Sequence, residues 1–334
     1  MVRVGVVGFG YWGPNLVRNC VEHDAIEVIR VCDMDSQRLK GVSRRYPNIQ
    51  TTTSFDDLLK DDIDAVIIAT PVATHALLAK KAFLAGKHVL LEKPIAASLS
   101  EAQELVEFSK KADKVLMVDH VFIYTPAVKK IKEICRAGQL GEIIYFDAVR
   151  TNLGAFQKDV NVIWDLAVHD VSIMQFILGE RPIGCSATGL SYFGNHLESI
   201  AYMTLFFPSN VIAHFHLSWA SPVKVRTILL GGDKKMILYD DTQASEKIKI
   251  YDKGIDVVSK EKLHDLYISY RSGDVISPKL ENTEALKFMC DDFVRAITTD
   301  STPISDGAFS LDVIKVLEAA NASIKMRGRE VKIN

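Results

Sequence analysis

The stretch Gly8–Gly13 reads GFGYWG and directly follows an apolar run, Val2–Val7. Pro14 comes next, and proline is favoured in the first turn of a helix, where its missing N–H is not needed. In this order, the first glycine allows a tight turn, the second lets the backbone approach a pyrophosphate, and the third lets the helix pack close to the strand. The helix amino end adds N–H donors for phosphate. The predicted cofactor contacts in this loop are Gly8, Phe9, Gly10, Tyr11, Trp12 and Gly13.

An acidic residue, Asp33, lies 20 residues after Gly13, at the end of the apolar run Glu27–Cys32. A carboxylate at this place accepts hydrogen bonds from ribose hydroxyls and repels a 2′-phosphate. No arginine follows Asp33 directly. We therefore expect NAD as the cofactor rather than NADP.

The first 120 residues alternate short apolar runs with helical patterns. Continuous apolar runs are typical of strands buried on both faces, and helices between them indicate a parallel sheet. The sequence thus predicts an α/β protein whose N-terminal domain, residues 1–120, is a doubly wound parallel Rossmann domain. The further runs are Ala65–Ala69, His88–Leu91 and Val115–Val118.

From about Tyr145 onward, short strand patterns follow one another with turns between them. Val211–Trp219 alternates apolar and polar residues, as expected for a strand with one face in the core. Two amphipathic helices close the chain. We expect residues 121–334 to form an α+β domain with a large, mostly antiparallel sheet that binds substrate and, through its exposed face, joins the chain into a homodimer or homotetramer.

Charge and cysteine content indicate which binding partners and which cellular location to expect. A net charge of −2 gives no sign of a nucleic-acid or membrane-surface binder. Five cysteines without a CxxC pair are typical of a reducing compartment, and neither a signal peptide nor a membrane span is evident, so a cytoplasmic location is expected. His214 and His216 have HxH spacing, but no third ligand suggests itself and no metal is expected.

The run His88–Leu91 ends in Glu92, Lys93 and Pro94. Ligands of such sheets bind beyond the carboxyl ends of the strands, so Lys93 is carried to the active cleft and Pro94 fixes the backbone there, with a cis bond as one option. From the residues alone, a catalytic lysine and a surface pair with Glu92 are equally good interpretations. The predicted contacts with the nicotinamide half are Thr70, Pro71, His75, Glu92 and Lys93.

Asp165 and His169 lie four residues apart in a predicted helix that opens at Trp164, so they share one face. A histidine beside a carboxylate can transfer protons near neutral pH. A capping aspartate with a surface histidine is the simpler interpretation of these two residues taken alone.

The glycine motif, Asp33 and the Glu92-Lys93-Pro94 tripeptide resemble the Gfo/Idh/MocA oxidoreductases over essentially the whole chain. The resemblance implies that Lys93 lies beside the nicotinamide and the substrate hydroxyl. It also implies that His169 is the catalytic base and that Asp165 assists it. Lys93 would then polarise the hydroxyl while the hydride moves to the nicotinamide.

Members of the family often carry GHxxRF after the sixth strand, whereas residues 119–124 here read DHVFIY. The missing arginine puts a polyol dehydrogenase in doubt. Residues 118–128, 152–154 and 159–165 look more like members that act in nucleotide-sugar pathways, some of which oxidise the 3-hydroxyl of a UDP-N-acetylhexosamine or its uronate. Arg150, Lys158 and Asn161 are equally well explained as solvated loop residues. The predicted substrate contacts are Lys93, His120, Tyr124, Arg150, Asn161 and His169.

Two other functions fit the same fold. One is a glycosidase that uses bound NAD for transient oxidation, and the other is a non-catalytic dinucleotide-binding sensor or repressor. The presence of both Lys93 and His169 disfavours the sensor.

Overall fold

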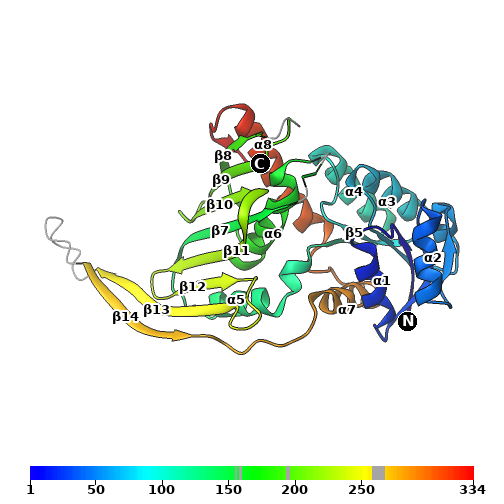
Figure 1. Cartoon of the computed structure of the whole chain (residues 1–334), viewed down its shortest axis with the longest axis horizontal. Coiled ribbons are helices and arrows are strands. Elements are labelled where there is room, and N and C mark those ends of the chain that lie inside the picture. Colours follow the sequence, from blue (N-terminus) through cyan, green and yellow to red (C-terminus); the bar gives the residue numbers. More distant parts are fainter. Residues whose placement is uncertain (155, 158–159, 193–195, 258–267) are drawn as a thin grey trace. The chain divides into compact units, whose positions relative to one another are not determined.

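Figure 1 shows a computed structural model of the chain, which describes residues 1–154, 156–157, 160–192, 196–257 and 268–334. The chain forms two compact units. The first comprises Met1–Thr125 and Thr283–Ile314, and the second comprises Pro126–Asn282 and Lys315–Asn334. This differs from the predicted division at residue 120, because Thr283–Ile314 returns to the first unit.

The first unit contains a six-stranded parallel sheet with the order β3-β2-β1-β4-β5-β6. The strand order reverses between β1 and β4, the place where such folds bind ligands at the carboxyl ends of the strands. All four residues of β4 are buried, as expected for a strand covered on both faces. The predicted Rossmann domain is confirmed. The strands are β1 (Val2–Val7), β2 (Ile26–Cys32), β3 (Gln50–Thr52), β4 (Ala65–Ile68), β5 (His88–Glu92) and β6 (Leu116–Asp119).

Helices flank this sheet, and one of them comes from late in the sequence. In Figure 1, α7 (Ala285–Thr298) lies beside α1 (Gly13–Val21), and the two helices contact each other. An ion pair of 2.6 Å between Arg18 and Glu284 joins them. The apolar face of α7 buries Leu286 and Phe293, so this helix completes the core of the first unit. The remaining helices are α2 (Ser36–Arg45), α3 (His75–Leu84) and α4 (Leu99–Ala112).

The second unit contains a nine-stranded sheet with the order β14-β13-β12-β11-β7-β10-β9-β8-β15. Within the described residues, its strand pairs are antiparallel apart from β7 with β10, which confirms a mostly antiparallel sheet. The strands are β7 (Ile143–Leu153), β8 (Gly184–Leu190), β9 (Ile200–Phe206), β10 (Ile212–Ser218), β11 (Ala220–Gly232), β12 (Met236–Asp240), β13 (Ile248–Val257), β14 (Ile268–Ile276) and β15 (Val331–Lys332).

One face of this sheet forms the core of the second unit. Ala213, Phe215 and Leu217 are fully buried, whereas Ile212 is 45% exposed, so β10 alternates as its sequence predicts. The helices of this unit are α5 (Pro126–Arg136), α6 (Val168–Leu178) and the second half of α8 (Gly307–Lys325). Within the described ranges, no helix combines the length and apolar character that crossing a bilayer requires.

Candidate functional site

The glycine-rich loop leaves β1 and enters α1 in a conformation that two of its glycines dictate. Gly8 has φ +94°, and a Cβ there would lie 2.4 Å from the carbonyl oxygen of Ala69. A Cβ on Gly13 would lie 2.1 Å from the carbonyl oxygen of Gly8. By contrast, the nearest atom to a Cβ on Gly10 is Nη1 of Arg38, at 3.6 Å. Packing therefore requires Gly8 and Gly13, while Gly10 keeps space open for a close backbone approach.

Asp33 is buried at the end of β2 and holds this loop. Its Oδ2 accepts a hydrogen bond from the amide of Phe9 at 2.7 Å, and its Oδ1 accepts one from the amide of Asp35 at 2.8 Å. A carboxylate has about four lone-pair sites, so both oxygens retain acceptor capacity for ribose hydroxyls.

Arg38 is a site residue that the sequence analysis missed. Its Nη1 lies 3.5 Å from Oδ2 of Asp33, and its side chain is half exposed. The analysis considered only the residues directly after Asp33, but α2 folds back after its N-cap Asp35 and brings residue 38 beside the carboxylate. A guanidinium at this place can attract a 2′-phosphate, which opposes the repulsion by Asp33.

The tips of β4 and β5 are joined by His75. Its Nδ1 lies 2.9 Å from the carbonyl oxygen of Pro94, and its Nε2 lies 2.8 Å from that of Thr70. The side chain is 1% exposed, and burial lowers the pKa of His75. His75 was predicted to contact the cofactor, whereas its two ring nitrogens lie beside backbone carbonyl oxygens of the two strand tips, and the neutral ring has one N–H to donate to them. Pro71 follows Thr70 directly and is exposed.

The tips of β5 and β6 carry a pair of acids. Glu92 and Asp119 lie opposite each other in the register of these strands. The amide of Lys93 donates to Oε2 of Glu92 at 2.9 Å, and the Lys93–Pro94 peptide bond is cis, as one option of the sequence analysis had it. The indole of Trp12 donates to Oδ2 of Asp119 at 2.7 Å, so Trp12 extends from the glycine-rich loop to this pair.

Burial governs the charges of this cluster. Desolvation, followed by the charge of Asp119, raises the pKa of Glu92 well above its usual range. Desolvation raises the pKa of Asp119 to about 6, although Trp12 and Lys93 oppose the shift. Desolvation, followed by the charge of Lys93, lowers the pKa of His120 to about 3. His120 is therefore neutral at pH 7, and its ring packs edge-on against Phe309 at 5.6 Å between centroids.

In the second unit, the segment with Asp165 and His169 begins as a π-helical turn, η4 (Ile163–Ala167), and continues into α6. The sequence analysis expected a regular helix from Trp164. Oδ2 of Asp165 accepts a hydrogen bond from Nε1 of Trp219 at 3.0 Å, and both Asp165 and His169 are partly exposed. Single π turns inside helices occur frequently at functional sites.

Three residues that were predicted to contact the substrate are buried and form hydrogen bonds with other side chains. The hydroxyl of Tyr124 is fully buried and donates to Asp292 at 2.8 Å, within the first unit. In the second unit, the guanidinium of Arg150 is buried and bonds both oxygens of Asp170, at 2.8 and 2.7 Å.

Asn161 is the third of these residues. Its amide nitrogen donates to Glu198 at 2.8 Å and to Asn321 at 2.9 Å, and its Oδ1 accepts from the amide of Trp164 at 3.2 Å. These contacts give Asn161 a role in fixing the start of η4. His120 is likewise only 1% exposed, and Lys158 lies outside the described residues.

Comparison with known proteins decides the family. Residues 2–120 match the model of an oxidoreductase family with an NAD-binding Rossmann fold, and residues 128–238 match the GFO/IDH/MocA C-terminal domain. The chain belongs to the Gfo/Idh/MocA family. The resemblance in the glycine motif and the Glu92-Lys93-Pro94 tripeptide is thus confirmed, and the protein is an NAD-dependent oxidoreductase of this family.

Relatives within the family differ in their chemistry. A UDP-N-acetylglucosamine 3-dehydrogenase from Acidithiobacillus ferrooxidans is 26% identical over 322 residues, which are 92% of each chain. A 2,7-anhydro-N-acetylneuraminate hydratase from Escherichia coli is 28% identical over 270 residues, 75% of this chain and 70% of the relative. The solved structure of the Acidithiobacillus dehydrogenase has a TM-score of 0.81 at 23% identity and covers 97% of each chain, a likeness that shows the fold.

The residues of the first unit fit the family's cofactor. NAD requires a phosphate site and a ribose site. The open space at Gly10 and the amino end of α1 suit the phosphates, and the acceptor oxygens of Asp33 suit the ribose hydroxyls. The predicted NAD-binding domain is therefore supported by geometry as well as by family membership.

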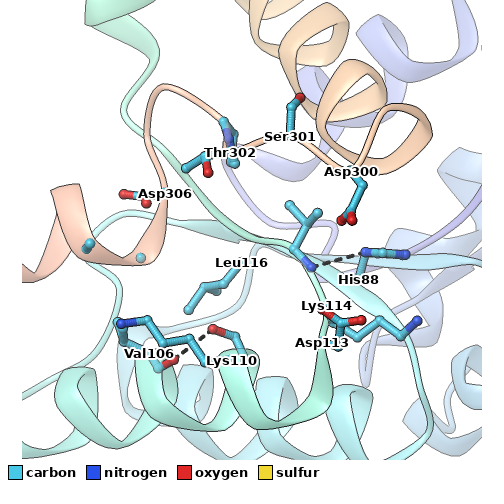
Figure 2. A pocket seen from close by; sticks show the side chains of 15 residues that line it. His88, Val106, Lys110, Asp113, Lys114, Leu116, Asp300, Ser301, Thr302 and Asp306 are labelled. Atoms are coloured by element: carbon cyan, nitrogen blue, oxygen red, sulfur yellow. Dashed lines mark hydrogen bonds between the residues drawn. The ribbon is translucent and has the colours of Figure 1, made fainter.

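A cavity of ≈ 270 Å³ lies at the opposite ends of the strands of the same sheet. Figure 2 shows the side chains that line it. It lies at the amino ends of β5 and β6, where His88 and Leu116 begin these strands. Lys110 and Asp113 line it from the end of α4, and Asp300 lines it from the segment after α7. Because β5 is five residues long, this cavity is about 13–16 Å from the tip with Lys93 and is not part of the cofactor cleft.

Proposed function

We propose that the protein transfers a hydride from a secondary hydroxyl of a nucleotide sugar to NAD⁺, and that its substrate is a UDP-N-acetylhexosamine or the corresponding uronate, oxidised at the 3-hydroxyl. One observation carries this proposal. The similarity to a UDP-N-acetylglucosamine 3-dehydrogenase spans 92% of both chains and thus includes both domains. An identity of 26% supports the substrate class and leaves the individual sugar open.

In the proposed reaction Lys93, His169 and Asp165 have separate roles. NAD⁺ supplies the hydride acceptor. The hydroxyl oxygen of the substrate accepts a hydrogen bond from the Lys93 ammonium, which stabilises negative charge as it develops there. His169 takes the hydroxyl proton, and Asp165, itself held by Trp219, orients and balances the imidazolium. The carbinol thereby loses one proton and one hydride and becomes a ketone, and the reverse reaction uses the same groups as acids.

The test is a screen of UDP-sugars with NAD⁺ that follows NADH formation, with an aminotransferase coupled to trap a 3-keto product. We expect turnover with a UDP-N-acetylhexosamine or its uronate. We expect Lys93→Ala and His169→Asn each to lower kcat by about 10²–10⁴-fold. Unchanged turnover in either variant would show that its assigned role is wrong. A product oxidised at another carbon would refute the proposed 3-hydroxyl.

A second function is favoured by one observation, namely the similarity to a 2,7-anhydro-N-acetylneuraminate hydratase over 75% of the chain. An enzyme that oxidises its substrate transiently, as in the glycosidase alternative, regenerates NAD⁺ within one cycle. Product analysis separates the two cases, because the dehydrogenase yields one NADH per sugar and the transient oxidation yields none.

We also propose that the open face of the nine-stranded sheet joins two copies of the chain. A row of apolar side chains crosses this face from strand to strand and leaves Ile212 45% exposed. Covering it would bury apolar surface. Light scattering is expected to give a dimer or tetramer, and Ile212→Glu is expected to shift the mass toward the monomer. The row consists of Phe206, Ile212, Tyr145, Met236 and Tyr251, and Gly231 occupies the register position between Tyr145 and Met236.

A further inference from the structure

The acids at the tips of β5 and β6 are close enough to share a proton. Glu92 and Asp119 are register partners at the ends of neighbouring parallel strands, Asp119 is buried, and the charge of Asp119 acts on Glu92. An ionised carboxylate can only accept hydrogen bonds. Two buried carboxylates at neighbouring strand tips therefore repel each other and cannot bond to each other unless one of them carries a proton.

The other contacts of the pair leave that proton in place. The backbone N–H of Lys93 and the indole N–H of Trp12 each occupy one acceptor position, on Glu92 and Asp119 respectively. Both donors favour an ionised partner, but neither adds a net charge to the cluster. Together they stabilise one negative charge, not two, on the pair.

Three titratable groups face the pair from the neighbouring elements. Lys93, on the connection that follows β5, interacts electrostatically with both carboxyls. His120, after β6, is neutral because burial lowers its pKa to about 3. Cys290, on α7, remains a thiol because a hydrogen bond with Cys20 and burial raise its pKa. Of these three groups, Lys93 is the one whose positive charge acts on both carboxyls.

We propose that Glu92 and Asp119 hold one proton between them and act as a single negative charge that pairs with the Lys93 ammonium at the tip of β5. Glu92 and Asp119 are then positioning residues for the reaction. They orient the Lys93 ammonium as a hydrogen-bond donor and leave the uptake of the substrate proton to His169. This inference rests on the proposed contact of Lys93 with the substrate hydroxyl.

The titration of the pair agrees with a single shared proton at neutral pH. Burial raises the pKa of Asp119 to about 6, and burial with the charge of Asp119 raises the pKa of Glu92 well above its usual range, so both acids hold a proton more readily than free carboxyls do. Below about pH 6 the pair takes up a second proton and loses its charge. The negative charge of the acid pair, which balances the charge of Lys93, is therefore expected to be present above about pH 6.

Amide variants separate charge from hydrogen bonding. In Asp119→Asn, the side-chain oxygen can accept from Trp12 while the new N–H₂ donates to Glu92, and the pair keeps one negative charge. Glu92→Gln likewise keeps one charge and the bond from the amide of Lys93. The double variant Glu92→Gln/Asp119→Asn retains the shapes and removes the charge. Glu107→Gln, on the exposed side of α4, is the matched control.

The first measurement uses the unliganded protein and needs no substrate. The infrared difference spectrum between wild type and Asp119→Asn at neutral pH is expected to show the carbonyl stretch of a protonated carboxyl, present in the wild type and absent in the variant. The control is expected to show no such band. If wild type and Asp119→Asn show the same protonated-carboxyl signal, no shared proton exists and the proposal is overturned.

The second measurement is the pH profile of kcat/KM with the sugar that gives turnover. Each single variant is expected to keep the alkaline limb of wild type within about half a pH unit. The double variant is expected to move it down by about one unit or more, since Lys93 has lost its counter-charge. An unmoved alkaline limb in a folded double variant overturns the assigned role. If the double variant does not fold, the infrared spectra of the single variants decide.

Failure of the proposed function has a different signature. In that case no UDP-sugar is oxidised by the wild type, while the infrared band of the shared proton is present. The infrared result therefore tests the carboxyl pair independently of the substrate.

Discussion

Trp12 and Asp119 are joined by a hydrogen bond of 2.7 Å between the indole N–H and a buried carboxylate oxygen. The two residues lie 107 positions apart in the sequence. The bond links the glycine-rich loop after β1 to the end of β6, and hence to the acid pair beside Lys93. The loop predicted to approach the cofactor phosphates and the strand tips predicted to face the nicotinamide half are thus parts of one hydrogen-bonded network.

Trp12→Phe should loosen this network. The substitution removes the donor to a buried carboxylate, which costs about 1–3 kcal/mol of unfolding free energy. It should also raise the Kd for NAD⁺, because the loop loses its anchor. Urea unfolding and calorimetric titration with NAD⁺ measure the two effects. Tyr11→Phe is the matched control for stability, because Tyr11 is 96% exposed and the loss of its hydroxyl should leave the unfolding free energy unchanged.

The glycines of the loop should separate folding from binding. Gly13→Ala places a methyl 2.1 Å from a carbonyl oxygen and is expected to destabilise the fold by about 1–3 kcal/mol. Gly10→Ala meets no atom closer than 3.6 Å. It should leave the melting temperature nearly unchanged while it weakens NAD⁺ binding, since the added methyl occupies the space of the pyrophosphate. Equal losses of stability in both variants would contradict this division.

Asp33 and Arg38 should set the choice between NAD⁺ and NADP⁺ by opposing each other. Asp33→Ala removes the repulsion of a 2′-phosphate and leaves the guanidinium in place, so kcat/KM for NADP⁺ is expected to rise at least about tenfold, or ~1.4 kcal/mol. In Asp33→Ala/Arg38→Ala, that gain should disappear. If NADP⁺ is already preferred by the wild type, the assignment of Asp33 as the discriminating residue is wrong.

Local patterns in the sequence were sufficient for the architecture of both units. The glycines after Val2–Val7, the apolar runs of the parallel sheet and the alternation in Val211–Trp219 each depend on neighbouring residues, and each appears in the structure as expected. The return of Thr283–Ile314 to the first unit depends on contacts between α7 and α1, which lie more than 250 residues apart. No local pattern contains that information.

The candidate site shows the same division. The strand pattern placed Lys93 directly after a strand end, and the structure ends β5 at Glu92. Tyr124, Arg150 and Asn161 were named as polar residues in or near expected loops. The structure gives each of them a buried partner that is distant in sequence, such as Asp292 for Tyr124 at a separation of 168 residues. Asp119 could have been recognised, because it ends the strand next to the one that Glu92 ends.

The pair of Arg150 and Asp170 should behave as a structural element. Arg150→Ala leaves a buried carboxylate uncompensated and is expected to cost about 3–5 kcal/mol of unfolding free energy, whereas Arg150→Met/Asp170→Leu should recover most of that loss. The double variant should keep KM for the sugar within a few-fold of wild type. A large rise in KM with unchanged stability would restore the substrate contact that the sequence predicted for Arg150.

His120 should make stability fall in weak acid. The folded protein holds its pKa at about 3, while the unfolded chain has the ordinary value near 6.5. Between these values the unfolded state binds a proton that the folded state does not, so this contribution to stability is full above about pH 6.5 and is lost as the pH falls toward 3, by up to ~1.4 kcal/mol per pH unit.

His120→Phe fills the same buried place beside Phe309 without a titratable group. Urea unfolding from about pH 7.5 to pH 5 should therefore show a shallower pH dependence in the variant than in wild type. Contributions of His75 and His88, whose pKa values burial also lowers, are common to both proteins and cancel in the difference. Parallel curves for wild type and variant would mean that His120 takes up its proton in the folded state.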